Sequence, residues 1–317
     1  MLSSTISKER DDRLSEHIVH TAILEDCFNL MTHSDEIPPE FRKIAAKYIN
    51  FARLGCITIS GDKFSFRLLE DCKAKWDTRR PEQMLEPVLS FVFGWVSHRA
   101  ADRQMKPIWK EPDKPKGSAD VDPKLSPTEC SIYHEGAVFR KYYTESGNLR
   151  YVISSEKFAD LDRGGRIKMD KLEGLMQALV LRNLFELQTI EEDDVDAWFE
   201  KVDLRTQRFY VDINRYVASA LRPEPDKAEE YLTGINFYDD SDRIIAAAKR
   251  LRNGDTMDCE ELKREIFEEP ASHYGKALKL AYQYVKAAGV YFFTDMSIDT
   301  LKDHLDIGKP GRDGRPA

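Results

Sequence analysis

Apolar residues recur at intervals of three and four along most of the chain, which is the spacing of buried and amphipathic helices. The first predicted helix covers residues 11–31. The second follows Pro38-Pro39 and ends at Leu54-Gly55, where glycine is a natural helix C-terminus. Residues 56–66 are interpreted as an irregular connection. No series of alternating apolar and polar residues predicts a sheet, so the predicted fold class is all-α.

The third predicted helix begins after Arg80-Pro81 and ends at Pro107. It is nearly all apolar, yet it carries a histidine and a carboxylate one helical turn apart, His98 and Asp102. Both continue one stripe of apolar side chains, which consists of Met84, Val88, Phe91 and Trp95. The pair is therefore predicted to point into the core, where an unpaired charge costs several kcal/mol. Its partner is either a metal ion or a protein cation.

Beyond residue 110 the chain begins with a loop rich in lysine, proline and glycine, which lasts to residue 123. Ser126-Pro-Thr-Glu129 then predicts a capping box that opens a helix carrying His134 and ending at Gly147. Further amphipathic helices are predicted over residues 154–289. Their expected breaks are Gly164-Gly165, Arg222-Pro-Glu-Pro225, Asn253-Gly254 and Pro270.

The predicted organisation therefore has three parts. Residues 1–150 form a helical core, and residues 151–306 add helices that either pack on this core or form a second helical subdomain. Residues 307–317 have almost nothing to bury and are predicted to be a disordered tail.

Composition narrows the class of protein. The net charge of −8 argues against a nucleic-acid partner, because phosphate backbones are bound by clustered lysine and arginine. The five cysteines are scattered and include no C-x-x-C pair, which favours reduced thiols. The N-terminus lacks the pattern of a secretory signal, and the most apolar segment, residues 84–96, is too short to span a bilayer. We expect a soluble cytoplasmic protein.

Four segments, in order, resemble the zinc-dependent phospholipase C family. They are the segment from His20 to Asp26 and residues 51–60, 94–107 and 134–138. The resemblance covers roughly residues 17–145 and implies an all-helical fold of the phospholipase C/nuclease type with a zinc cluster between its helices. It implies hydrolysis of phosphodiesters by metal-activated water. The metal ligands that it implies are His20, His98, Asp102 and His134.

The chain departs from the family pattern at three ligand positions. Ser60 stands where the family has an aspartate, Lys106 replaces a second histidine before the proline, and Val138 replaces a glutamate. Lys106 follows Asp102 by one helical turn, so its ammonium can pair with that carboxylate in place of a metal. A full multi-zinc centre is therefore not expected, and the alternatives are one retained zinc ion or none.

Two functions remain open. The first is a metal-dependent phosphoric ester hydrolase with a reduced site, acting on a phosphodiester or a phospholipid head group. The second is a non-catalytic helical protein that keeps the scaffold and binds a protein partner through its C-terminal helices. The sequence offers no Ser-His-Asp or Cys-His nucleophile set, and it does not identify the substrate.

Overall fold

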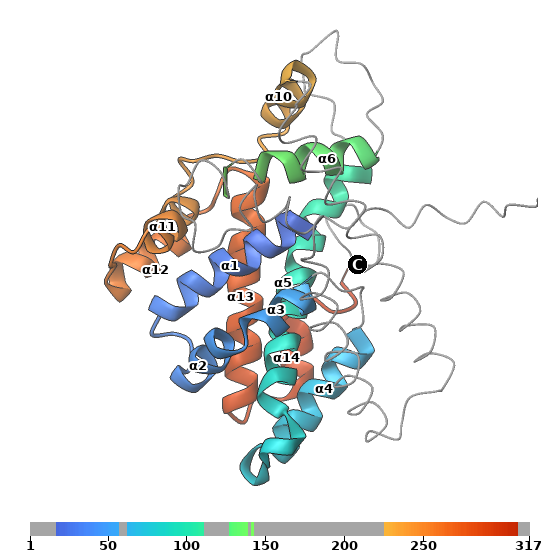
Figure 1. Cartoon of the computed structure of the whole chain (residues 1–317), viewed down its shortest axis with the longest axis vertical. Coiled ribbons are helices and arrows are strands. Elements are labelled where there is room, and N and C mark those ends of the chain that lie inside the picture. The colour runs from blue at the N-terminus through green and yellow to red at the C-terminus, as the bar shows by residue number, and fades with distance from the viewer. Residues whose placement is uncertain (1–16, 57–61, 111–126, 139–140, 143–224, 310–317) are drawn as a thin grey trace, which may run out of the picture.

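The computed structural model describes residues 17–56, 62–110, 127–138, 141–142 and 225–309 (Figure 1). These residues are mostly helical and none of them lies in a strand, which confirms the all-α prediction. The helices are α1 (His17–His33), α2 (Pro39–Lys47), α3 (Ile49–Cys56), α4 (Asp62–Lys75), α5 (Leu85–Lys110), α6 (Pro127–Val138), α10 (Pro225–Gly234), α11 (Arg243–Arg252), α12 (Cys259–Phe267), α13 (His273–Phe293) and α14 (Ile298–His304). Two 3-10 turns, η1 (Trp76–Thr78) and η2 (Pro81–Gln83), separate α4 from α5.

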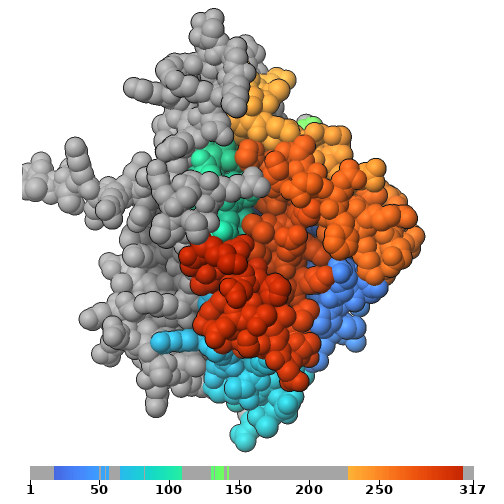
Figure 2. Space-filling model, turned by 180° about the vertical axis from the view of Figure 1, so that it is seen from behind, coloured from blue at the N-terminus to red at the C-terminus, as the bar shows by residue number. Residues whose placement is uncertain are grey.

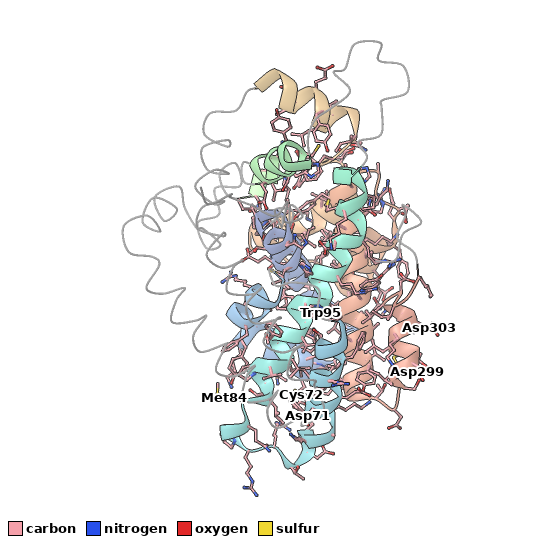
Figure 3. The ribbon with its side chains drawn as sticks, turned by 90° about the vertical axis from the view of Figure 1, so that its right-hand side faces the viewer. Asp71, Cys72, Met84, Trp95, Asp299 and Asp303 are labelled. Atoms are coloured by element: carbon pink, nitrogen blue, oxygen red, sulfur yellow. The ribbon has the colours of Figure 1, made fainter. Side chains whose placement is uncertain are left out.

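Helices α1 and α5 occupy the interior because they are apolar on nearly all sides. Every residue of α5 from position 88 to position 102 is buried, and Trp95, labelled in Figure 3, is 2% exposed. Helix α13 packs along both α1 and α5, and the C-terminal helices, orange and red, lie over the centre and right of the face seen in Figure 2. The buried apolar residues form one cluster that runs from α1 to α14. The described C-terminal helices therefore share the core of the N-terminal ones.

Two glycines allow α3 and α5 to touch through their backbones. A Cβ atom on Gly94 would lie 1.8 Å from the carbonyl oxygen of Ala52, and one on Gly55 would lie 2.0 Å from that of Phe91. Both distances are far below van der Waals contact, so only glycine fits at either position. This close crossing brings the C-terminal end of α3, which finishes at Cys56, against the middle of α5.

The predicted second helix is in fact two helices, α2 and α3, which are separated at Tyr48. The backbone of Tyr48 leaves the helical region, with φ −117° and ψ 33°. Its carbonyl oxygen accepts a hydrogen bond from the hydroxyl of Ser90 at 2.9 Å and another from the amide of Phe51 at 2.9 Å. The break is stabilised by α5, which is a contact that local periodicity does not reveal.

Helix α4 was not predicted, and it includes part of the segment interpreted as an irregular connection. Residues 57–61 lie outside the described part, but the helix already contains Asp62. Its buried face has the spacing of a helix, with Phe66, Leu69 and Cys72 each three residues apart. The signal was present in the sequence, in a segment that carries many charged residues.

The predicted end of the third helix at Pro107 is wrong, because α5 continues through this residue to Lys110. Proline removes one backbone donor and crowds the carbonyl four residues earlier. Near a C-terminus this affects little more than the last turn, and Ile108, 5% exposed, holds that turn on the core. Apolar burial therefore outweighs the local effect of the proline.

In the C-terminal half, α10 begins at Pro225, Asn253-Gly254 follows α11, and Pro270 separates α12 from α13, as predicted. The predicted breaks at Gly147 and Gly164-Gly165 lie outside the described residues. Residues 307–309 form a hydrogen-bonded turn in which Ile307 packs on the core, and residues 310–317 lie outside the described part. All five cysteines are free, and no described helix has both the length and the apolar character of a membrane span.

Candidate metal centre

Helices α1 and α5 bring together three of the four predicted metal ligands. His20 comes from α1 and His98 and Asp102 from α5, and one ligand atom of each lies within 4.8 Å of the others. The three residues are 1%, 3% and 9% exposed. The predicted stripe therefore does point inward from Val88 to Asp102, where it meets a histidine from a distant part of the sequence, whereas Met84 precedes α5 and lies in a left-handed turn.

Asp102 connects all members of the cluster. Its Oδ1 atom lies 3.2 Å from Nε2 of His20, and its Oδ2 atom lies 3.2 Å from Nε2 of His98. The ammonium of Lys106 contacts the same Oδ2 atom, as the spacing of one helical turn predicts. Both oxygen atoms of one carboxylate are thus shared among two imidazoles and one ammonium.

The orientation of His98 is fixed by a backbone carbonyl. Its Nδ1 atom donates a hydrogen bond to the carbonyl oxygen of Cys56 at 2.9 Å, so a neutral imidazole carries its lone pair on Nε2. Burial lowers the pKa of His98 although Asp102 opposes this effect, so the ring is neutral near pH 7. The Nε2 lone pair therefore faces a carboxylate oxygen, and a cation between or beside these two acceptors stabilises the arrangement.

Asp102 is ionised although it is buried. Burial by itself raises its pKa, but the ammonium of Lys106 and a hydrogen bond from His20 hold that pKa well below its usual range. The site therefore offers one negative charge and two imidazole nitrogen atoms.

The donor atoms of the cluster are of the kinds that zinc binds. Zinc bonds to imidazole nitrogen and carboxylate oxygen are about 2.0–2.1 Å long, so two ligand atoms of a tetrahedral ion lie about 3.3 Å apart. Both imidazole–carboxylate distances here are 3.2 Å, but they join the two histidines to different oxygen atoms of Asp102, so a single ion would need a small shift of these side chains. The rings of His20 and His98 stack with their centroids 4.7 Å apart, and the Nε2 atom of each faces Asp102. Three protein ligands are the usual number in a catalytic zinc site, where the fourth position is open.

His134, the fourth predicted ligand, does not belong to this group. Its Nε2 atom lies 3.0 Å from the hydroxyl of Tyr231, and its ring lies parallel to that of Phe237 with the centroids 4.2 Å apart. It joins α6 to α10 and the segment that follows. Of the positions predicted to be substituted, Val138 is buried in the core, whereas Ser60 lies outside the described residues.

Glu135 positions the cluster in a way that the sequence did not indicate. Its two carboxylate oxygen atoms accept the backbone amide of Ile18 at 3.0 and 2.7 Å. A carboxylate at this place satisfies an amide in the first turn of α1 and interacts favourably with the helix dipole. Glu135 thus anchors α1 two residues before His20. The Cys56 carbonyl was missed as well, and because it is a backbone group it has no signal in the sequence.

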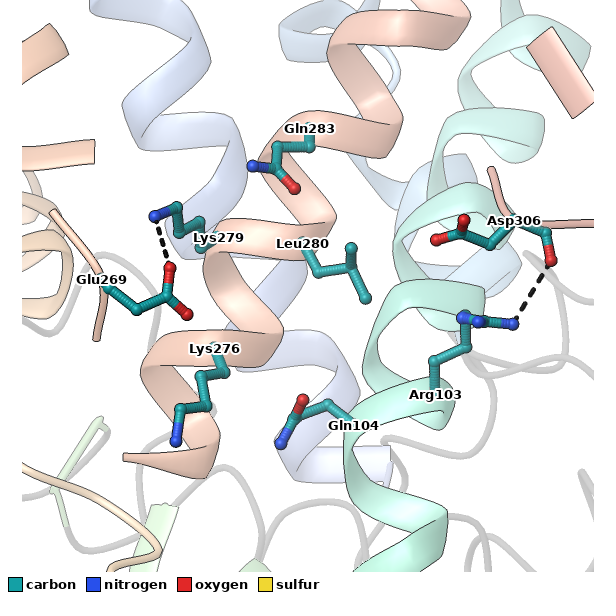
Figure 4. Close-up of a pocket in the computed structure, with 8 residues that line it drawn as sticks. All are labelled: Arg103, Gln104, Glu269, Lys276, Lys279, Leu280, Gln283 and Asp306. Atoms are coloured by element: carbon teal, nitrogen blue, oxygen red, sulfur yellow. Dashed lines mark hydrogen bonds and ion pairs between the residues drawn. The ribbon is translucent and has the colours of Figure 1, made fainter. Parts of the chain in front are cut away.

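A pocket of about 240 Å³ lies between α5 and α13, on another face of α5 (Figure 4). Arg103 and Gln104 line it, and they are turned by about 100° and 200° around the helix from Asp102. Lys279 pairs with Glu269 at 2.9 Å, and Arg103 donates to the carbonyl oxygen of Asp306 at 3.3 Å. None of His20, His98 and Asp102 lines this pocket, so it is separate from the candidate centre.

No family model, curated protein or solved structure matches this chain. The described structure defines a helical protein with a buried His-His-Asp centre and a lysine at its edge. Any assignment of function therefore depends on the geometry of this centre and on the order of the sequence motifs.

Proposed function

We propose that this protein is a metal-dependent phosphoric ester hydrolase of the zinc-dependent phospholipase C type, with a reduced site that holds one zinc ion. The ligands are His20, His98 and Asp102, while His134 takes no part. The phospholipase C/nuclease fold belongs to the same proposal, because it is supported by the order of the motifs and by the helical core. The reaction class comes from those motifs, whereas the metal comes from the geometry.

The observation that carries the proposal is the orientation of His98. Its Nδ1–H group donates a hydrogen bond to the Cys56 carbonyl oxygen. Its Nε2 lone pair points toward Asp102, and the Nε2 atom of His20 lies close to the same carboxylate. Histidines that bind metals commonly donate their second ring nitrogen to a carbonyl or carboxylate group, because this bond fixes the tautomer and the ring orientation. The arrangement is thus typical of a metal ligand.

In such a site some residues would hold the metal ion, others orient its ligands, and Lys106 attracts the anionic substrate. A zinc ion held there polarises a phosphoryl oxygen and lowers the pKa of a water molecule for attack on phosphorus. Cys56 and Glu135 orient the ligands, the first through His98 and the second through α1. Lys106 has a side chain that is 39% exposed, so within the described part the cluster reaches the surface at a positive charge. Anionic phosphoryl groups are attracted to that charge.

Metal analysis of the purified protein tests the proposal. After expression with added zinc we expect about one equivalent of zinc in the wild-type protein, and a large loss in His98→Ala and Asp102→Asn. His134→Ala is the matched control, because it removes a buried histidine outside the cluster. The zinc-loaded protein is expected to hydrolyse bis(p-nitrophenyl) phosphate. Less than about a tenth of an equivalent of zinc, manganese or iron in the wild-type protein contradicts the proposal.

The second candidate function is a non-catalytic scaffold that binds a protein partner through its C-terminal helices. The contact between Lys106 and Asp102 favours it, because the ammonium neutralises the carboxylate without any metal. The scaffold hypothesis expects no metal and no hydrolysis, so the same measurement separates the two functions.

A further inference from the structure

Helix α5 carries a line of three side chains that ends in a lysine. His98, Asp102 and Lys106 follow one another at intervals of four residues, and the last two are in contact. The side chain of Asp102 is 12% exposed, whereas that of Lys106 is 39% exposed. Lys106 therefore reaches into the cluster from the surface, and its ammonium can leave without rearranging the core.

The Lys106 ammonium occupies the position beside Asp102 that a bound metal ion would take. Oδ2 of Asp102 contacts both the Lys106 ammonium and the Nε2 atom of His98. A divalent cation bound at that oxygen would therefore lie next to the ammonium. Two cations on one carboxylate oxygen repel each other strongly in a partly buried site, where the effective dielectric constant is about 20. Lys106 and a metal ion therefore exclude each other from this oxygen atom of Asp102.

We propose that Lys106 is a displaceable counterion of this centre. Its ammonium neutralises Asp102 in the metal-free protein and leaves when a divalent cation binds to His20, His98 and Asp102. The released ammonium then pairs with the anionic oxygen atoms of a phosphoryl ligand. This inference rests on the proposed metal site and adds a regulatory and a ligand-binding role for Lys106.

The chain contains a matched control for Lys106. Lys75 pairs with Asp71 at 2.8 Å on α4, also one helical turn apart, and their side chains are 33% and 13% exposed. This pair has nearly the geometry and exposure of the Lys106–Asp102 pair. It lies outside the group of residues that could hold a metal.

Amine-specific acetylation of the full-length protein, followed by mass spectrometry, tests the displacement. We expect zinc to raise the modification rate of Lys106 by about tenfold, the factor that corresponds to loss of an ion pair worth about 1.4 kcal/mol. The rate at Lys75 is expected to stay unchanged, and zinc should have no effect on Lys106 in the His98→Ala variant. An unchanged rate at Lys106 in zinc-loaded wild-type protein overturns the inference.

The variant Lys106→Met supplies the second measurement. It keeps much of the length of the side chain and removes its charge, so we expect zinc to bind at least about tenfold more tightly than to wild type. Lys75→Met should leave the zinc affinity unchanged. Inorganic phosphate is expected to bind the zinc-loaded Lys106→Met protein about tenfold more weakly than zinc-loaded wild type, because the released ammonium is missing. Equal phosphate affinities overturn the ligand-binding part.

The outcomes separate this inference from the proposed function. If wild type binds zinc and Lys106→Met binds it equally well, the counterion role is wrong and the metal site stands. If only Lys106→Met binds zinc, Lys106 holds Asp102 but is not displaced by the metal, so both the displacement and the proposed hydrolase activity of the native chain are wrong. If neither protein binds zinc, both proposals fail.

Discussion

Asp102 is the residue on which the centre depends, because it contacts both histidines and the lysine. Its carboxylate is buried, so these partners must compensate for the lost hydration. Their combined effect exceeds the effect of burial and holds the pKa of Asp102 well below its usual range. In metal-free protein, stability and site geometry are thus linked through one side chain.

The depressed pKa of Asp102 predicts how stability depends on pH. A carboxyl group whose pKa is lower in the folded state contributes stability above its unfolded pKa of about 3.9, and this contribution is lost as the pH falls through the folded value. We expect Asp102→Asn to lower the free energy of unfolding by about 1–3 kcal/mol at pH 7. The difference from wild type should shrink as the pH falls below about 4. Urea denaturation of both metal-free proteins at several pH values measures it.

Burial raises the pKa of Glu25 and of Asp26, which acts in the opposite direction. These residues are present in both proteins, so their contribution cancels in the comparison. Asp71→Asn is the control, because it breaks an ion pair that contains no histidine, and we expect it to cost less than about 1 kcal/mol. A difference between Asp102→Asn and wild type that is the same at pH 7 and pH 3 contradicts the account of Asp102.

At the scale of the elements, the crossing of α3 and α5 determines where the centre forms. The two helices touch at Gly55 and Gly94, which places the Cys56 carbonyl within hydrogen-bonding distance of His98. Helix α1 is placed separately, since its N-terminal end is held by Glu135 of α6. The ligands therefore keep their relative positions only while both packing contacts are intact.

Gly94→Ala tests the crossing. The added methyl group has no room, so α3 and α5 must separate, and we expect a loss of about 1–3 kcal/mol or more in the free energy of unfolding. Gly289→Ala is the control, because its Cβ would lie 3.1 Å from a side-chain atom of Phe41, a much less severe approach than the 1.8 Å from backbone at Gly94. Thermal unfolding measures both variants, and zinc affinity should fall only in Gly94→Ala. Equal effects of the two substitutions contradict the role given to the crossing.

At the scale of the whole molecule, the two ends of the described chain complete one core. Arg252 of α11 is buried next to Asp26 of α1, with 3.6 Å between the guanidinium and the carboxylate, and it stacks on the ring of Tyr142 at 3.8 Å. The hydroxyl of Tyr274 in α13 donates to the same carboxylate at 3.0 Å. A buried charge network of this kind ties the C-terminal helices to the helix that carries His20.

Arg252→Met is expected to lower the free energy of unfolding by about 3–5 kcal/mol, because it leaves Asp26 buried without its cation. Arg250→Met on the same helix is the matched control. Arg250 is 45% exposed and pairs with Glu261, so its loss should cost less than about 1 kcal/mol. Chemical denaturation monitored by tryptophan fluorescence measures both. Similar stabilities of the two variants contradict the coupling of the C-terminal helices to α1.

The sequence by itself determined the helical class and the line of His98, Asp102 and Lys106 on one face of α5. Both follow from local spacing, because residues four apart lie on the same side of a helix whatever surrounds it. Local rules failed at Tyr48 and at Pro107, where side chains from distant segments or burial in the core outweigh the local preference.

Only the tertiary structure decided which residues complete the centre. His20 joins it and His134 does not, although the sequence motifs imply both as ligands equally. The physical reason is that a contact between helices depends on where remote backbones approach, as at Gly94, and on groups such as the Cys56 carbonyl that every residue type possesses. Periodicity specifies the face of a helix, and packing specifies what that face meets.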